Sequence, residues 1–255
     1  MTRSEADHVL DEAETLWLSG EKQRARECCL RARLLYRQTG DGRGEADALT
    51  RMGDIEAETG HGNAARQAFV EARQLYAQEG AQREQAGILV RLGHLSQREG
   101  DIPGTRSFYL SALELYESAL DASGLGHVHR ALGHLEKECG AQDKALDCYR
   151  EALACYRRAA DTLGEAGTLK AMALIQRALG HPDKARAECD QALELLRQAG
   201  DLLGEAKAMR LMARIMGDEG RHDEARKSMR AAAKMFARAG DVAAHDAAEE
   251  EAKSL

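Results

Sequence analysis

The sequence repeats itself every 40 residues, and this period constrains the fold more than any other feature. Six glycines keep the interval: Gly20, Gly60, Gly100, Gly140, Gly180 and Gly220. Six alanines keep it as well: Ala32, Ala72, Ala112, Ala152, Ala192 and Ala232. No insertion or deletion interrupts the six units. Such a period predicts a row of like units, each of which buries its apolar surface against the next.

Each repeat has the pattern of two helices. In the second repeat, Leu49, Met52 and Ile55 share one stripe of a helix over 44–59, and a second helix is expected over 62–78. Gly60 separates the two helices, as a glycine after a helix C-terminus does. Aspartates before the first helix of a unit are predicted N-caps: Asp41, Asp121, Asp161, Asp201 and Asp241. Small residues at one position of the first helix predict close helix packing: Ala13, Gly53, Gly93, Gly133, Ala173 and Ala213.

Composition agrees with a helical protein and excludes several classes. Only two residues are prolines, and 31% are charged. The net charge of −7 disfavours a general binder of polyanions. We expect no membrane span, because no apolar run approaches the ~18 residues required. The acidic N-terminus lacks an apolar signal core, so we expect a cytoplasmic protein. The six cysteines form no CxxC pair and are interpreted as small core residues.

A family resemblance extends these expectations. The pattern of small, glycine and aromatic positions across both helices resembles the tetratricopeptide repeat. In the second repeat the pattern consists of Leu49, Met52, Gly53, Gly60, Ala65, Phe69 and Ala72. The period of 40 is similar to the longer variety found in G-protein-signalling modulators, kinesin light chains and sensor modules of bacterial regulators. The resemblance implies an all-α fold, a right-handed α-solenoid of six helix-turn-helix repeats.

The expected organisation is a single solenoid domain over residues 1–255. Its repeats lie approximately at 4–40, 44–80, 84–120, 124–160, 164–200 and 204–240. A capping helix is expected over 241–253, and a frayed tail is the alternative. We find no glycine-rich phosphate loop, no HExxH and no nucleophile elbow, so we expect neither catalysis nor a cofactor.

The resemblance also implies that partners lie in a concave groove lined by the first helix of each repeat. Counting from the small residue of that helix gives thirty groove positions. In repeats one and two these hold five acids and no base, whereas in repeats four to six they hold seven bases and two acids. The candidate partner-binding residues among them are Trp17, Asp47, Asp54, His94, His127, Arg130, His134, Lys137, Lys170, Arg177, Lys207, Arg210 and Arg214.

The basic half of the groove predicts an acidic partner segment, and the alternative is a solvated charged surface without a ligand. The three groove histidines are interpreted as polar lining and not as a metal site, because Arg130 lies between two of them. Trp17 is either an anchor for a partner or packs under an extension of the solenoid. The asparagine of the family's carboxylate clamp is absent after each small residue, so we do not expect chaperone-tail binding.

These features favour a protein-protein interaction module, an adaptor or scaffold that binds an acidic peptide or helix. The alternative is a ligand-responsive sensor or regulatory subunit of a bacterial signalling or transcription system. Nucleic-acid binding is disfavoured by the net charge and by the 4% aromatic content. The polarised groove also permits head-to-tail self-association of acidic and basic ends.

Overall fold

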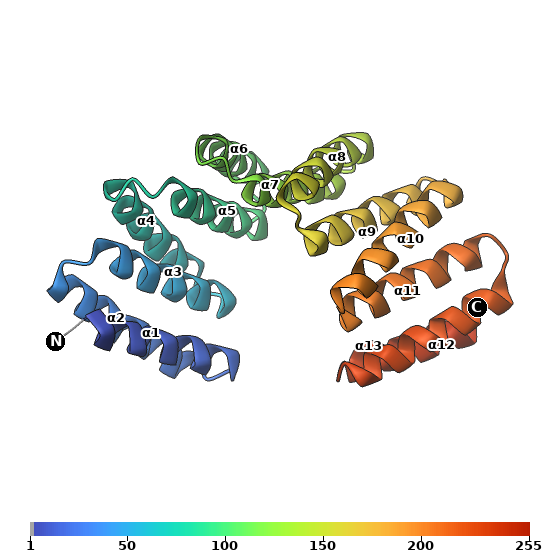
Figure 1. The fold of residues 1–255 in the computed structure, drawn as a ribbon, viewed down its shortest axis with the longest axis horizontal. Helices are drawn as coiled ribbons and strands as arrows, with labels where there is room; N and C mark the ends of the chain where they lie inside the picture. Colours follow the sequence, from blue (N-terminus) through green and yellow to red (C-terminus); the bar gives the residue numbers. More distant parts are fainter. Residues whose placement is uncertain (1–2) are drawn as a thin grey trace. The chain divides into compact units, whose positions relative to one another are not determined.

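A computed structural model describes residues 3–255, and nearly all of them lie in thirteen α-helices (Figure 1). The helices are α1 (Arg3–Leu18), α2 (Lys22–Thr39), α3 (Gly42–Glu58), α4 (Gly62–Gln78), α5 (Gln82–Arg98), α6 (Ile102–Ser118), α7 (Ala122–Glu138), α8 (Gln142–Ala159), α9 (Thr162–Ala178), α10 (Pro182–Ala199), α11 (Leu202–Asp218), α12 (His222–Arg238) and α13 (Val242–Ser254). Residues 3–255 contain no β-strand. The prediction of an all-α repeat fold is therefore confirmed.

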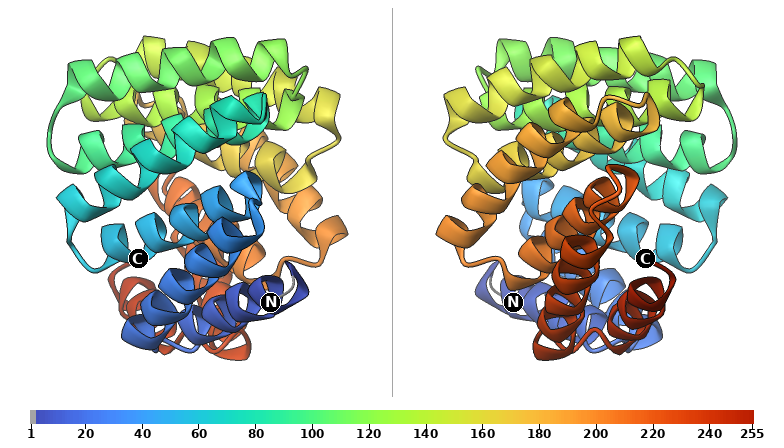
Figure 2. Two further views of the ribbon diagram at one scale, coloured as in Figure 1. Left: turned by 90° about the vertical axis from the view of Figure 1, so that its left-hand side faces the viewer. Right: turned by 90° about the vertical axis from the view of Figure 1, so that its right-hand side faces the viewer.

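The helices form two compact units, one that ends at Gly124 and one that begins at Leu125. We call the first helix of each repeat an A helix and the second a B helix. In the first unit α1 packs on α2, α3 on α4 and α5 on α6, and each B helix also contacts the next A helix. In the second unit each helix from α8 to α12 packs on the next one along the chain, and α13 packs on α12 (Figure 2). The prediction that both units form one continuous domain stays a prediction.

Helix ends follow the predicted signals. The Asp41 carboxylate accepts a hydrogen bond of 2.9 Å from the Gly44 backbone N–H, and the other four predicted N-cap aspartates make the same bond. Glycines end most helices in the left-handed conformation, which lacks a steric cost for glycine. Two repeats place other residues there, and these are Leu120 at a φ of 52° and Ala160 at a φ of 53°.

The small position of each A helix matches the side chain of the B helix that covers it. A Cβ added at Gly93 would lie 2.4 Å from the ring of Tyr109, and Gly53 and Gly133 are covered as closely by aromatic rings. Where an alanine occupies the small position, the covering residue sixteen positions later is not aromatic, as with Ala173 and Cys189. The distance between the A and B helices is thus kept, because a larger residue on one helix stands opposite a smaller residue on the other.

Candidate functional site

Two neighbouring cavities lie on the surface formed by the A helices of the first unit, which we call the first A-helix face. A polar cavity of about 290 Å³ is lined by residues that include Asp47, Thr50, Arg51 and Tyr76. A more apolar cavity of about 340 Å³ is lined by residues that include Trp17, Ala57, Phe69, Leu95 and Arg98. Asp54 and Arg91 line both cavities.

Acidic side chains pair with basic side chains or other donors of the neighbouring A helix at two fixed spacings. At a spacing of 37 residues, Glu14 pairs with Arg51 at 3.2 Å and Asp54 with Arg91 at 2.8 Å. At a spacing of 41 residues, the Trp17 Nε1–H donates to Glu58 over 3.1 Å. The spacings follow from the period, because a residue 40 positions later lies at the same height on the next A helix and the adjacent turn lies within reach.

These contacts change the interpretation of the acidic groove residues. Arg51 and Arg91 stand two positions before the small residue, a register outside the expected groove, and both reach the first A-helix face. The groove positions counted in the first two repeats therefore omit one base of this face, Arg51. The guanidinium of Arg51 also lies 5.0 Å from the centre of the Trp17 ring, a cation–π distance.

Tyrosines of the B helices reach between the A helices to the predicted site residues. The hydroxyl of Tyr76 donates to Asp47 over 2.5 Å, and burial raises the pKa of Asp47 above its ordinary value. These hydroxyl contacts were not predicted, because the repeat pattern places the tyrosines on the B helices and does not show which A-helix side chains they reach. The recurring signal was the tyrosine itself, at positions 36, 76, 116 and 156.

The three predicted histidines each contact a tyrosine hydroxyl through Nδ1. The distances are 2.8 Å for His94 to Tyr109, 3.0 Å for His134 to Tyr149 and 3.0 Å for His127 to Tyr156. In each pair the rings meet edge to face. Within the described residues, no group of three or more histidine, cysteine or acidic side chains could hold a metal ion.

The surface formed by the A helices of the second unit, the second A-helix face, carries the predicted basic residues. Three of these arginines have internal acidic partners. Arg177 contacts Asp218 at 2.5 Å, and Arg210 and Arg214 both contact Glu251 of α13. Burial alone would raise the pKa of Glu251, but the hydrogen bonds from Arg210 and Arg214 lower it to about 2. Glu251 therefore occupies this part of the basic surface.

The other predicted cations of this face form no ion pair with an acidic side chain among residues 3–255, although the charge of Asp201 acts on Lys170. They are Arg130, whose guanidinium lies 5.7 Å from the centre of the Tyr156 ring, and Lys137, Lys170 and Lys207. Lys170 and Lys207 are 37 residues apart, the spacing at which an acid and a base pair on the first A-helix face. Burial lowers the pKa of the half-buried Lys170, and the positive charge of Lys207 lowers it further.

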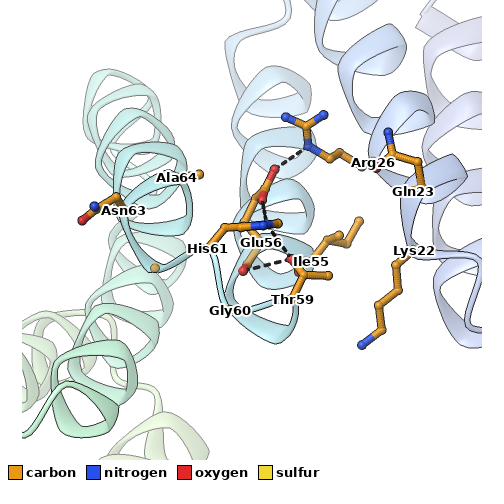
Figure 3. Close-up of a pocket in the computed structure, with 11 residues that line it drawn as sticks. Lys22, Gln23, Arg26, Ile55, Glu56, Thr59, Gly60, His61, Asn63 and Ala64 are labelled. Atoms are coloured by element: carbon orange, nitrogen blue, oxygen red, sulfur yellow. Dashed lines mark hydrogen bonds and ion pairs between the residues drawn. The ribbon is translucent and has the colours of Figure 1, made fainter.

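A larger cavity, of about 590 Å³, lies at the turns between A and B helices of the first unit. Glu56 lies at its centre, between Arg26 and His61 (Figure 3). Lys22, at the edge, pairs with Glu58 at 3.1 Å. These charged groups satisfy one another, so we assign this cavity to the connection between repeats and not to ligand binding.

Comparisons with known proteins place these observations in a family. A model described as tetratricopeptide repeat matches residues 164–238, and a model described as soluble NSF attachment protein, SNAP, matches residues 2–130, about half of the chain. None of the curated proteins compared with the sequence matches it. No described helix is both long and apolar enough to cross a membrane.

Solved structures with the same fold include three proteins of different lengths. BtubC (BKLC) from P. vanneervenii is 20% identical with a TM-score of 0.65, and the match covers 92% of this chain and 88% of that one. A STAND protein with a tetratricopeptide repeat sensor from Pyrococcus horikoshii is 16% identical with a TM-score of 0.71 (97% and 42% covered). This chain therefore spans less than half of that protein.

The third structure is the Rap conjugation gene regulator of plasmid pLS20 in complex with the Phr* peptide. It is 14% identical with a TM-score of 0.66, and the match covers 96% of this chain and 74% of that one. At these identities the likeness shows the fold alone. Together the two family models match residues 2–130 and 164–238. The chain belongs to the tetratricopeptide-repeat family, and its first half matches the SNAP model of that type.

Proposed function

We propose that this protein is a non-catalytic interaction module that binds an acidic segment of a partner peptide or protein on its second A-helix face. The pLS20 Rap regulator, which shares the fold, is in complex with a peptide, and this supports a peptide as the ligand. Lys170 and Lys207 carry the proposal, because two cations stand at the spacing where this protein elsewhere pairs a cation with an acid.

Like charges on facing helices destabilise each other, and the half-burial of Lys170 adds a cost of desolvation. A carboxylate between the two ammonium groups would remove both costs and would accept charge-assisted hydrogen bonds. The second A-helix face already holds one acid in this manner. Glu251 accepts hydrogen bonds of 3.0 and 2.6 Å from Arg214 and is shared with Arg210.

The test is a charge reversal on this face. The double variant Lys170→Glu/Lys207→Glu should bind a fluorescent twelve-residue peptide of aspartate, glutamate and serine at least about 30-fold more weakly than the native protein, since each lost pair is worth about 1 kcal/mol. The matched control is Lys144→Glu/Lys184→Glu, which changes the net charge equally at exposed positions of the B helices. Equal binding by both double variants would contradict the proposal.

The second candidate function is a ligand-responsive sensor, and the fold likeness to the P. horikoshii repeat sensor favours it. In that case the acidic peptide should change the dimensions of the protein, because ligand binding would select one curvature of the repeats. Small-angle scattering with and without the peptide distinguishes the two functions, since an adaptor would keep its radius of gyration. Head-to-tail self-association stays a prediction, for which concentration-dependent light scattering is the measurement.

A further inference from the structure

The apolar cavity beside Trp17 has the character of an anchor pocket. Phe69 and Leu95 are almost fully buried and line it together with the small side chain of Ala57. Most polar groups around it are already engaged, since Trp17 donates to Glu58 and Arg91 contacts Asp54. The cavity therefore presents mainly apolar surface to a ligand, and an apolar side chain could enter it without leaving a polar group unsatisfied.

One charge at this cavity has no acidic partner. Arg98 is exposed, and its Nη1 donates to the backbone carbonyl of Ala57 over 2.8 Å, but no carboxylate within residues 3–255 pairs with it. A guanidinium carries five N–H donors, so Arg98 keeps most of them for a ligand. The neighbouring charges Asp54 and Arg91 cancel each other. The charge that remains favours an anionic group next to the apolar one.

We propose that this cavity takes one leucine-sized or aromatic side chain of the partner, flanked by a carboxylate that pairs with Arg98. This inference rests on the proposed function, because it assigns an apolar residue to the acidic partner. It also decides between the two interpretations of Trp17 in favour of the anchor. Within the first unit, recognition of the partner then combines this apolar cavity with the charge of Arg98.

The experiment uses Trp17 as its own reporter, because it is the single tryptophan of the sequence. The probes are two twelve-residue acidic peptides that differ only at a central position, which is leucine in one and serine in the other. The leucine peptide should shift the Trp17 emission and should bind about tenfold more tightly or better, as expected for burial of one leucine side chain. The serine peptide should leave the emission unchanged.

Variants locate the effect. Ala57→Leu fills the cavity and should remove the preference for the leucine peptide, whereas Ala77→Leu, at an exposed position of α4, should keep it. Arg98→Gln should weaken binding of the leucine peptide by about fivefold, and Arg73→Gln at an exposed position of α4 should have no effect. Circular dichroism confirms that each variant is folded, and Arg98→Gln removes the charge at the pocket while the apolar residues Phe69 and Leu95 are kept.

The outcomes separate this inference from the proposed function. If both peptides bind equally and the Trp17 emission does not change, the pocket is refuted while acidic binding stands. If the leucine preference survives in Lys170→Glu/Lys207→Glu, the pocket is supported by itself. If neither peptide binds the native protein, both proposals fail. An emission change that depends on protein concentration without peptide would show a second copy of the chain in the cavity and would also refute the inference.

Discussion

Replacement of Glu251 by glutamine should loosen α13 from the last repeat. Glu251 accepts hydrogen bonds from two guanidinium groups, and its pKa is about 2, compared with about 4.3 for a free glutamate. A difference of about two pH units, at about 1.4 kcal/mol each, gives an upper value of about 3 kcal/mol. Because 28% of the side chain is exposed, screening by water reduces this value, and we expect a loss of about 1–2 kcal/mol.

Hydrogen exchange of the α13 backbone amides at pH 7 measures this loss. A cost of about 1–2 kcal/mol lowers protection by about 5–30-fold, and the effect should be confined to α13 and its contacts with α12, because repeat proteins open locally. The control is Glu250→Gln, which removes an exposed pair with Lys253 on the same helix and should change protection by less than about twofold. Equal protection in Glu251→Gln and the native protein would refute the reasoning.

The same contact predicts a pH dependence. The folded-state pKa of Glu251 lies below the unfolded value, so its stabilisation is complete above about pH 5 and is lost as the pH falls through 4 towards 2. The melting temperatures of the native protein and of Glu251→Gln should therefore differ at pH 6 and converge near pH 2. A difference that stays constant over this range would show that the arginines do not stabilise the ionised carboxylate.

Three further changes have definite expectations. Gly93→Ala should destabilise the protein by about 1–3 kcal/mol in urea unfolding, and addition of Tyr109→Cys should recover much of the loss, because the pair would then resemble Ala173 and Cys189. Leu120→Gly should stabilise it by up to about 1 kcal/mol, since Leu120 holds a left-handed conformation with its side chain 89% exposed. Burial raises the pKa of Glu188 to about 7, so ionisation costs stability as the pH rises from about 4.3 towards 7. Glu188→Gln should accordingly raise the melting temperature at pH 8 and have little effect at pH 4.

The sequence predicted the repeat fold in detail because each rule that it used was local. The helix over 62–78, the aspartate caps and the turn glycines depend on neighbouring residues, and all are confirmed. The prolines at 103 and 182 lie in the first turn of their helices, where the missing N–H costs no helical hydrogen bond. Six copies of the same unit made these local signals easy to separate from chance.

The charge pairing between repeats was not predicted, because it depends on which turn of one A helix faces which turn of the next. Arg51 and Arg91 were therefore left out of the groove, and Arg210 and Arg214 were counted as open although Glu251 holds both. A search for opposite charges at spacings of 37 and 41 residues would have found these contacts. The tyrosine hydroxyls that reach Asp47 and the histidines also stand at recurring spacings, of 29 and 15 residues, but their reach depends on the helix spacing that the small residues permit.

Charged residues 37 positions apart thus have two roles, and a single substitution can convert one role into the other. Opposite charges 37 residues apart join neighbouring A helices, whereas Lys170 and Lys207 leave the same spacing open for an acid from outside. Lys207→Glu should convert this open pair into an internal ion pair. The variant should raise the free energy of unfolding in urea by about 1 kcal/mol. It should also weaken binding of the acidic peptide by at least about tenfold, because an internal carboxylate would replace that of the partner. A misfolded variant would lose both properties, and a variant with unchanged peptide affinity would show that this spacing has no role in binding.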